Sequence, residues 1–103
     1  RYQIIGIASN SMVPIFKRGD SVIYDKGEKQ INVGDIIVFK KSESVVVHRV
    51  VATRKKDKEE YYVTKGDNNK KNDSKLVSKK DILGVVTCDI PYLGYPSIWI
   101  KKK

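Results

Sequence analysis

The sequence predicts a mainly β fold, a curled antiparallel sheet or a partly open β-barrel with at most one or two short helical turns. Nearly every apolar segment is short and rich in Val, Ile and Tyr, and clusters of Gly, Asp, Asn or Lys separate these segments. No segment reaches the length of a stable amphipathic helix. The 103 residues suit one small domain, 1–103, and 40% hydrophobic residues suffice for a core.

Seven strands are expected along the chain, over residues 2–8, 21–25, 35–40, 44–53, 60–65, 82–89 and 95–100. Gly19-Asp20 and Gly34-Asp35 each predict a turn that leads into a strand. The three residues 41–43 are short enough to join two antiparallel strands as a hairpin, and the charged segment 53–59 is expected to end a second one.

Two segments after the fifth expected strand contain no strand pattern. Residues 66–75, GDNNKKNDSK, predict an irregular polar loop. Residues 78–81 have the composition of one helical turn, with Ser78 as its cap.

Charge and cysteine content limit the classes of function. The net charge is +9, and lysines gather in segments 55–58, 65–80 and 101–103, so the surface could meet nucleic acid or an anionic membrane. No stripe of aromatic and basic residues accompanies this charge, which favours solvated loops over a nucleic-acid partner. Cys88 is the only cysteine, so an intrachain disulfide and a thiolate zinc site are excluded. We expect Cys88 to lie in the core.

The ends of the chain suggest a larger protein. The chain begins at Arg1 rather than Met, and it ends soon after the apolar and aromatic stretch 92–100. No run of about 18 apolar residues is present. We therefore expect a fragment whose membrane helices lie beyond one or both of its ends.

A serine and a histidine are the candidates for chemistry. Ser11 ends the polar cluster 9–11 after the first expected strand and precedes Pro14, so its hydroxyl is expected to be exposed. His48 is the only histidine and lies within an apolar run. A serine hydroxyl beside a neutral imidazole is the arrangement of nucleophilic catalysis, and Asp67 or Asp73 could orient the ring.

The same residues also fit purely structural roles. His48 shares a strand face with Val46 and Val50, so it could cap a core. Ser9 and Ser11 could close turns through backbone hydrogen bonds, and Asp67 could form a turn. The residue pattern alone leaves both interpretations open.

Three motifs resemble those of type I signal peptidases. Residues 9–24, SNSMVPIFKRGDSVIY, resemble the nucleophile motif S-x-S-M-x-P with its later G-D and apolar strand. Residues 45–51, VVVHRVV, resemble the strand of the general base, which is His in the endoplasmic-reticulum, archaeal and spore-former type. Residues 64–69, TKGDNN, with a second Asp six residues after the first, resemble the acidic box of that type. The motifs occur in family order with family-like spacing and cover most of the chain.

The resemblance implies a role for each matching residue. Ser11 matches the nucleophile and His48 the general base. Asp73 matches the third member, which we favour over Asp67, the Gly-Asp of the same box. Ser9 matches the side-chain donor to the oxyanion, beside the Ser11 backbone N–H. Arg49 follows the base and is expected to pair with a loop carboxylate.

The implied protein is a membrane-associated serine endopeptidase that needs no metal or cofactor, with its catalytic domain on the extracytoplasmic face. Its partner would be a secretory precursor, such as a signal-peptide or pilin-like substrate, cleaved after small residues at −1 and −3. Ile7, Met12 and Val46 are the expected walls of shallow pockets for those residues, and the substrate is expected to add as a strand. The sequence departs from the bacterial acidic box at Asp73-Ser74-Lys75, where Arg would follow Ser, and Lys cannot form the Arg fork.

Two other functions remain as alternatives. A self-cleaving repressor-type serine peptidase shares the Ser-Met turn and a β core, but that class uses Lys as its base, against His48. A small basic β module that binds nucleic acid or an anionic membrane surface fits the net charge of +9. That module leaves the ordered series of three motifs unexplained.

Overall fold

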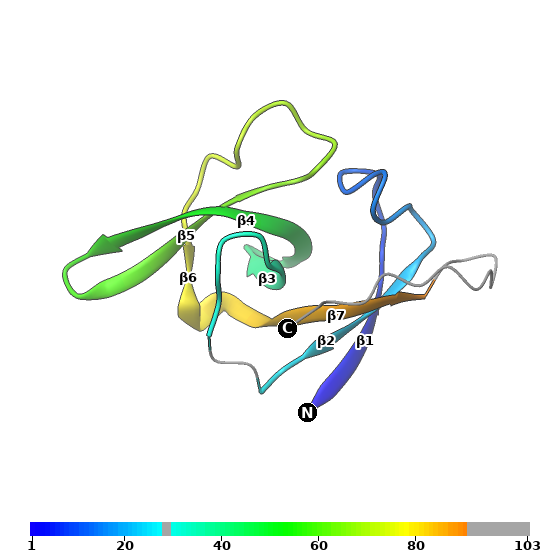
Figure 1. Ribbon diagram of the computed structural model, residues 1–103, viewed down its shortest axis with the longest axis horizontal. Helices are drawn as coiled ribbons and strands as arrows, with labels where there is room; N and C mark the ends of the chain where they lie inside the picture. Colours follow the sequence, from blue (N-terminus) through cyan, green and yellow to red (C-terminus); the bar gives the residue numbers. More distant parts are fainter. Residues whose placement is uncertain (28–29, 91–103) are drawn as a thin grey trace.

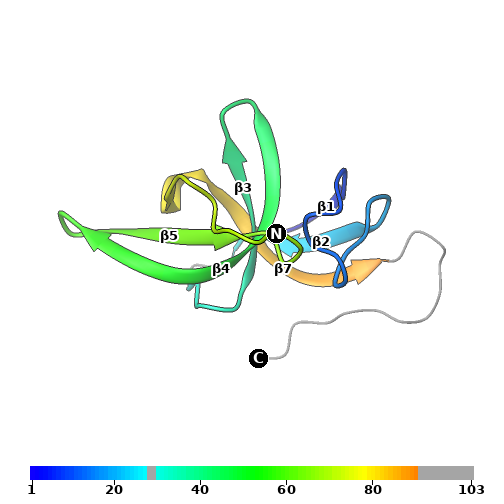
Figure 2. The same cartoon turned by 90° about the horizontal axis from the view of Figure 1, so that it is seen from above.

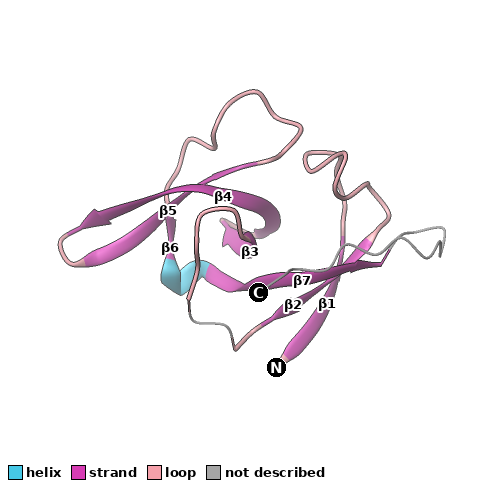
Figure 3. Cartoon of the chain, in the orientation of Figure 1, coloured by secondary structure: helices cyan, strands magenta, loops and turns pink. Residues whose placement is uncertain are grey.

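The computed structural model describes residues 1–27 and 30–90, and its strands form one antiparallel sheet (Figures 1 and 3). The elements are β1 Tyr2–Gly6, β2 Ser21–Asp25, β3 Ile36–Lys41, β4 Ser44–Lys56, β5 Glu59–Lys65, β6 Val77–Ser78, the 3₁₀ turn η1 Lys79–Asp81, and β7 Ile82–Ile90. The predicted mainly β fold with at most one or two helical turns is confirmed in this part of the chain.

The strand order explains how distant segments meet. The seven strands lie in the order β1-β2-β7-β3-β4-β5-β6, so the last described strand inserts between β2 and β3. Among the described strands, β1 and β6 are the two edges, and the sheet is open rather than a closed barrel. Viewed from above, the β3–β4 hairpin projects from the middle of the sheet. β1 and β2 lie on one side of it, and the β4–β5 hairpin extends on the other (Figure 2).

The core lies on both faces of the central strands. Residues 36–39 of β3 are buried without a break, as in a strand that is covered on both faces. Ile36 and Val38 contact a cluster that includes Met12 and Phe16, whereas Ile37 and Phe39 contact a second cluster, with Val50, Tyr62, Val77 and Val85 among its members. The segment after β1 is thereby packed against the centre of the sheet.

Residues 7–20 form a loop that is closed at its base. The Ile7 N–H donates to the Asp20 carbonyl at 2.7 Å, and the Gly19 N–H donates to the Ile7 carbonyl at 2.9 Å. Gly19 has φ +98°, a left-handed conformation that glycine adopts without strain. Met12 and Phe16, at most 1% exposed, anchor the loop in the core. Ser11 therefore stands on a packed support although it lies outside any strand.

Several boundaries differ from the sequence predictions. β4 continues three residues past Thr53, because the hairpin turn is only Asp57-Lys58, with φ +52° and +69°, as in the tight two-residue turns of hairpins. The two-residue strand β6 was not predicted because it is too short to show alternation. Ser78 precedes η1 but makes no side-chain capping hydrogen bond, so its predicted role as a cap is wrong.

Two further predictions concern the end of the chain. Cys88 is half-buried and lies outside both core clusters, so its predicted core position is wrong. The expected strand 95–100 lies outside the described residues. Within residues 1–27 and 30–90, no helix has the length and hydropathy needed to cross a membrane.

Candidate active site

Three predicted site residues from separate parts of the sequence contact one another in series, with His48 between Ser11 and Asp73. Ser11 comes from the loop after β1, His48 from β4, and Asp73 from the loop after β5. The Ser11 Oγ lies 3.1 Å from His48 Nε2, and His48 Nδ1 lies 2.6 Å from Asp73 Oδ2. The two loops that carry Ser11 and Asp73 stand at the same end of the sheet (Figure 1).

The contact with Asp73 fixes the ring tautomer of His48. An ionised carboxylate only accepts hydrogen bonds, so Nδ1 carries the proton in a contact of 2.6 Å with Asp73. Nε2 then has a free lone pair directed at the Ser11 Oγ. This arrangement is suited to moving a proton from the serine hydroxyl to the imidazole.

His48 also has a packing role. The ring is 9% exposed, and it lies edge-on to Phe39 with 6.3 Å between the ring centroids. Both ring nitrogens nevertheless have polar partners, and one of those partners is an aspartate. A histidine that served only as core would not require that pair of contacts.

Ser9 stands beside the Ser11 hydroxyl. Its Oγ lies 3.1 Å from the Ser11 Oγ and accepts a long hydrogen bond, 3.4 Å, from the Ser11 N–H. The Ser9 hydroxyl and the Ser11 N–H therefore lie together next to the Ser11 Oγ. A negative charge that develops there would meet two donors.

A groove of about 340 Å³ runs past these side chains. The predicted wall residues Ile7, Met12 and Val46 line it together with Ser9, Ser11 and His48. One side of the groove is the segment 5–8, which includes the end of β1, an edge strand of the described sheet. The other side is residues 45–47 of β4, which pair with β3 but not with β5. Within the described residues, two segments that lack a strand partner on one edge therefore border the groove.

Asp67 does not contact His48. Its carboxylate instead accepts two hydrogen bonds from the Arg49 guanidinium, from Nε and Nη2, each at 2.9 Å. Arg49 Nη1 also donates to the Gly34 carbonyl at 2.7 Å. The hydrogen bond to Asp67, aided by its charge and opposed by burial, raises the pKa of Arg49. This fork ties the loop after β5 to β4 and to the turn before β3.

Replacing Arg49 with lysine is expected to lower the free energy of unfolding by about 1 kcal/mol, because an ammonium cannot replace a planar fork and a third contact at once. Both side chains are partly exposed, which keeps the effect small. Urea denaturation of Arg49→Lys measures it. Arg54→Lys is a suitable control, because Arg54 is exposed and its one side-chain hydrogen bond within residues 1–27 and 30–90 is to the neighbouring Thr53 carbonyl. Equal stabilities of Arg49→Lys and the unmodified chain would contradict this role of the fork.

The loop after β5 is joined directly to the loop that carries Ser11. The Asn68 N–H donates to the Ser11 carbonyl at 2.7 Å, and its side chain donates to the Asn10 carbonyl at 3.1 Å. The Asp67 N–H contacts the Met12 sulfur at 3.3 Å. These contacts set the distance between the two loops, and thereby help to place Ser11 relative to the loop that carries Asp73.

Gly66 lies close against both Ser11 and His48. A Cβ there would stand 2.7 Å from the Ser11 carbonyl oxygen and 3.0 Å from His48 Nε2. Real side chains do not make such contacts with backbone, so any larger residue must push the loops apart. Sequence reasoning did not single out this glycine, although it lies within the TKGDNN motif.

Replacing Gly66 with alanine is expected to lower kcat for the reaction of this site by up to about 100-fold, because a displacement of about 1 Å between reacting groups has that effect. The measurement is kcat at substrate saturation, with the melting temperature recorded in parallel. Gly34→Ala is the matched control: its φ of +99° makes alanine strained, but a Cβ there meets nothing within 4 Å. We expect Gly34→Ala to lose stability and keep kcat. The same kcat in Gly66→Ala and the unmodified chain would contradict the close approach.

Thr64 is a second residue that sequence reasoning missed. Its Oγ1 donates to Asp73 Oδ2 at 2.7 Å, and the side chain is fully buried. It begins the TKGDNN motif, so its position beside the acidic box was the available signal. Within the described ranges, no group of three or more His, Cys, Asp or Glu side chains lies together as possible metal ligands.

Contacts between a serine, an imidazole and a carboxylate, on a frame of β strands, are those of the serine peptidase class. A family model described as Peptidase S24-like matches residues 2–87. The match spans well over half of the sequence, and the chain belongs to the Peptidase S24-like family.

Similar proteins extend the comparison over nearly the whole chain. The Signal peptidase complex catalytic subunit SEC11 of Ogataea parapolymorpha is 38% identical over 96% of this chain, and the aligned part is 68% of that protein. The proteins of the same name from Zygosaccharomyces rouxii and Lachancea thermotolerans are 34% and 37% identical, each over 96% of this chain and 66% of their own length. The chain thus spans about two thirds of the length of these relatives. The resemblance to His-type signal peptidases is confirmed by these comparisons.

Proposed function

We propose that this chain is the catalytic domain of a membrane-associated signal peptidase that uses Ser11 as nucleophile and His48 as general base. The observation that carries the proposal is the line of contacts from Ser11 through His48 to Asp73, at 3.1 and 2.6 Å. His48 Nε2 takes the hydroxyl proton as Ser11 Oγ attacks the scissile carbonyl, and it then protonates the leaving amine. Asp73 orients the ring and stabilises the imidazolium that forms.

Oxyanion stabilisation falls to the Ser9 hydroxyl and the Ser11 N–H. Both groups lie next to the Ser11 Oγ, and their mutual hydrogen bond is long, at 3.4 Å. A carbonyl oxygen that acquires negative charge beside Ser11 would replace this weak contact by two stronger ones. Such a gain in the transition state is the kind of binding that accelerates a reaction.

The substrate is proposed to be an extended precursor segment with small residues at −1 and −3. The groove is bounded by the edge of β1 and by the part of β4 that lacks a β5 partner, so an added strand has backbone groups to bond on both sides. Alternate side chains of an extended peptide point to one face. Ile7, Met12 and Val46 line the groove, and we expect them to form the shallow apolar pockets for alanine-sized groups.

The test of this function is processing of a membrane precursor with an Ala-X-Ala site. The expected result is one cut after the second alanine, identified by the new amino terminus of the product. A matched precursor with Leu at −1 and −3 is expected to stay intact, because those side chains exceed the pockets. No cleavage of a panel that includes secretory and pilin-like precursors would overturn the proposal. Salt-sensitive binding of nucleic acid without any cleavage would favour the basic β module instead.

The proposed location is a cell membrane, with this domain on the extracytoplasmic face. This location is supported by the similarity to catalytic subunits of a signal peptidase complex. Protease accessibility of the domain in sealed vesicles of known orientation tests this location.

A further inference from the structure

We propose that Thr64 is a positioning residue, which holds the Asp73 carboxylate against His48. Thr64 touches neither Ser11 nor the groove, so it acts on the reaction only through Asp73. The proposal rests on the Ser11–His48–Asp73 mechanism given above. It adds a fourth side chain to that mechanism.

The contacts at Asp73 are shared between two donors. Asp73 Oδ2 lies 2.6 Å from His48 Nδ1 and accepts a second hydrogen bond from Thr64 Oγ1 at 2.7 Å. The two residues also meet through the main chain, where the Asp73 N–H donates to the Thr64 carbonyl at 2.7 Å. Thr64 therefore fixes both the backbone and the carboxylate of Asp73.

Asp73 needs such an anchor because of its place in the fold. It lies in the irregular segment 66–76, whereas Thr64 is in β5 and pairs with Val50 of β4, two residues from His48. Thr64 has no exposed surface, so its rotamer is set by packing. Thr64 thereby holds the Asp73 carboxylate of the loop in a fixed position relative to the sheet. Functional groups held by rigid elements keep their geometry better than groups held by loops alone.

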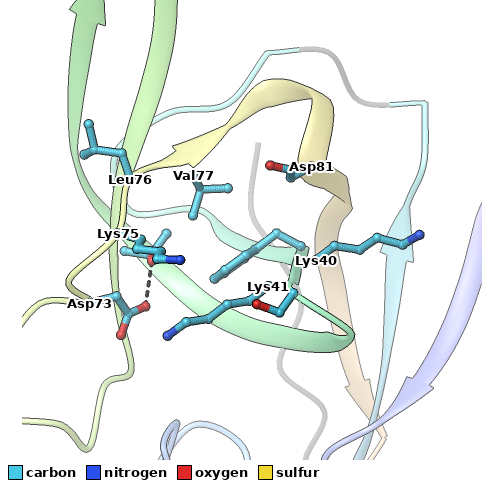
Figure 4. Close-up of a pocket in the computed structure, with 10 residues that line it drawn as sticks. Lys40, Lys41, Asp73, Lys75, Leu76, Val77 and Asp81 are labelled. Carbon is cyan, nitrogen blue, oxygen red and sulfur yellow. Dashed lines mark hydrogen bonds between the residues drawn. The ribbon is translucent and has the colours of Figure 1, made fainter.

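Two lysines near Asp73 could attract its carboxylate away from His48, which makes the Thr64 hydrogen bond important. Asp73 also lines a cavity of about 190 Å³ with Lys41 and Lys75, and Figure 4 shows the Lys41 side chain extending toward the Asp73 side of it. The Asp73 side chain is 15% exposed, and no ion pair joins it to either lysine in the described part of the chain. A carboxylate without the Thr64 hydrogen bond is free to turn toward these ammonium groups. The hydroxyl keeps it on the imidazole.

The test compares Thr64→Val, which removes the hydroxyl at similar volume, with Thr64→Ser, which keeps it. We expect Thr64→Val to lower kcat about tenfold with little change in KM, as when a partner that orients a functional ligand is lost. Thr64→Ser is expected to retain most of kcat. Equal kcat in Thr64→Val and the unmodified chain would overturn the proposal, and so would an equal loss in both variants.

Lys75 provides a readout that a purely structural role would not move. Lys75→Gln, at a lysine that does not line the groove, is expected to leave the activity of the unmodified chain nearly unchanged, but to restore part of the kcat lost in Thr64→Val. Additive effects would overturn the competition between Lys75 and the imidazole, and with it this account of Thr64.

The NMR signal of the His48 ring proton tests the role of Thr64 and the underlying Ser11–His48–Asp73 mechanism separately. His48 is the only histidine, so its NMR signals need no further assignment. An Nδ1–H bonded at 2.6 Å to a carboxylate is expected far downfield and protected from exchange. Loss of this signal in Thr64→Val and its retention in Thr64→Ser support the proposal. A signal unchanged in Thr64→Val overturns Thr64 alone, whereas no such signal in the unmodified chain overturns the Asp73 contact and the mechanism with it.

Discussion

Replacing Ser11 with alanine is expected to lower kcat for precursor cleavage by at least about 1,000-fold, the largest effect of any change in this chain. The hydroxyl lies 3.1 Å from His48 Nε2, and no other hydroxyl in the described part of the chain occupies that position: the neighbouring Ser9 Oγ bonds Ser11 instead. Removal of the Ser11 Oγ leaves the groove and the imidazole intact but no atom to attack the carbonyl. The rate of processing at saturating precursor measures the loss.

The same assay with His48→Ala and the double variant tests whether the two residues act as a unit. We expect His48→Ala to lose a similar factor and the double variant to be no slower than either single one, because each change alone removes the same step. Ser44→Ala is the control, an exposed serine of β4 that does not line the groove. Multiplicative losses, or residual processing by Ser11→Ala at more than about one tenth of the normal rate, would contradict the assigned roles.

Replacing Asp89 with asparagine is expected to stabilise the fold at pH 7.5 by up to about 3 kcal/mol and to leave it unchanged at pH 4. Asp89 of β7 and Asp20 of the Ser11 loop are both 5% exposed. Burial, the Asp20 charge and a hydrogen bond with Asp20 raise the pKa of Asp89 from 3.8 to about 6, with burial the largest cause. Among the residues that the structure describes, one Asp89 oxygen finds no hydrogen-bond partner. The folded chain is thus most stable when Asp89 carries its proton.

The sign of the pH dependence follows from this raised pKa. Between about pH 4 and pH 6 the folded state keeps a proton on Asp89 that the unfolded state releases, so stability falls as the pH rises through that window. Above about pH 6 both states are ionised and the loss is complete. Urea denaturation of both chains at pH 4, 5, 6 and 7.5 measures the difference.

Asp20 supplies the control for the Asp89 prediction. Asp20→Asn removes the neighbouring charge that helps to raise the Asp89 pKa, while its amide oxygen can still accept the hydrogen bond from the Lys17 N–H. We expect a smaller pH-dependent gain from Asp89→Asn in this background. A stability difference between Asp89→Asn and the unmodified chain that does not vary with pH would contradict the buried-acid interpretation.

The strand positions could largely be predicted from the local residue pattern. Alternation and β-branched composition located the core of each described strand longer than two residues, and only boundaries moved. The end of β4 was misplaced because its last residues, RKK, are charged and exposed and carry no apolar alternation. Pairing with β5 extends the strand there, and pairing is a property of two segments together.

The strand content and the candidate residues Ser11, His48 and the two aspartates could be predicted from local sequence, because motifs record which side chains are neighbours along the chain. Local sequence left open which aspartate meets the imidazole, and it missed Thr64 and Gly66. These points depend on the three-dimensional fold, because Ser11 and His48 are 37 residues apart in the sequence, and His48 and Asp73 are 25 apart. Asp67 and Asp73 lie in one irregular loop whose path depends on the Arg49 fork and on the Thr64 contacts. Contacts between distant segments are fixed by packing and hydrogen bonding in three dimensions, which no spacing along the chain records.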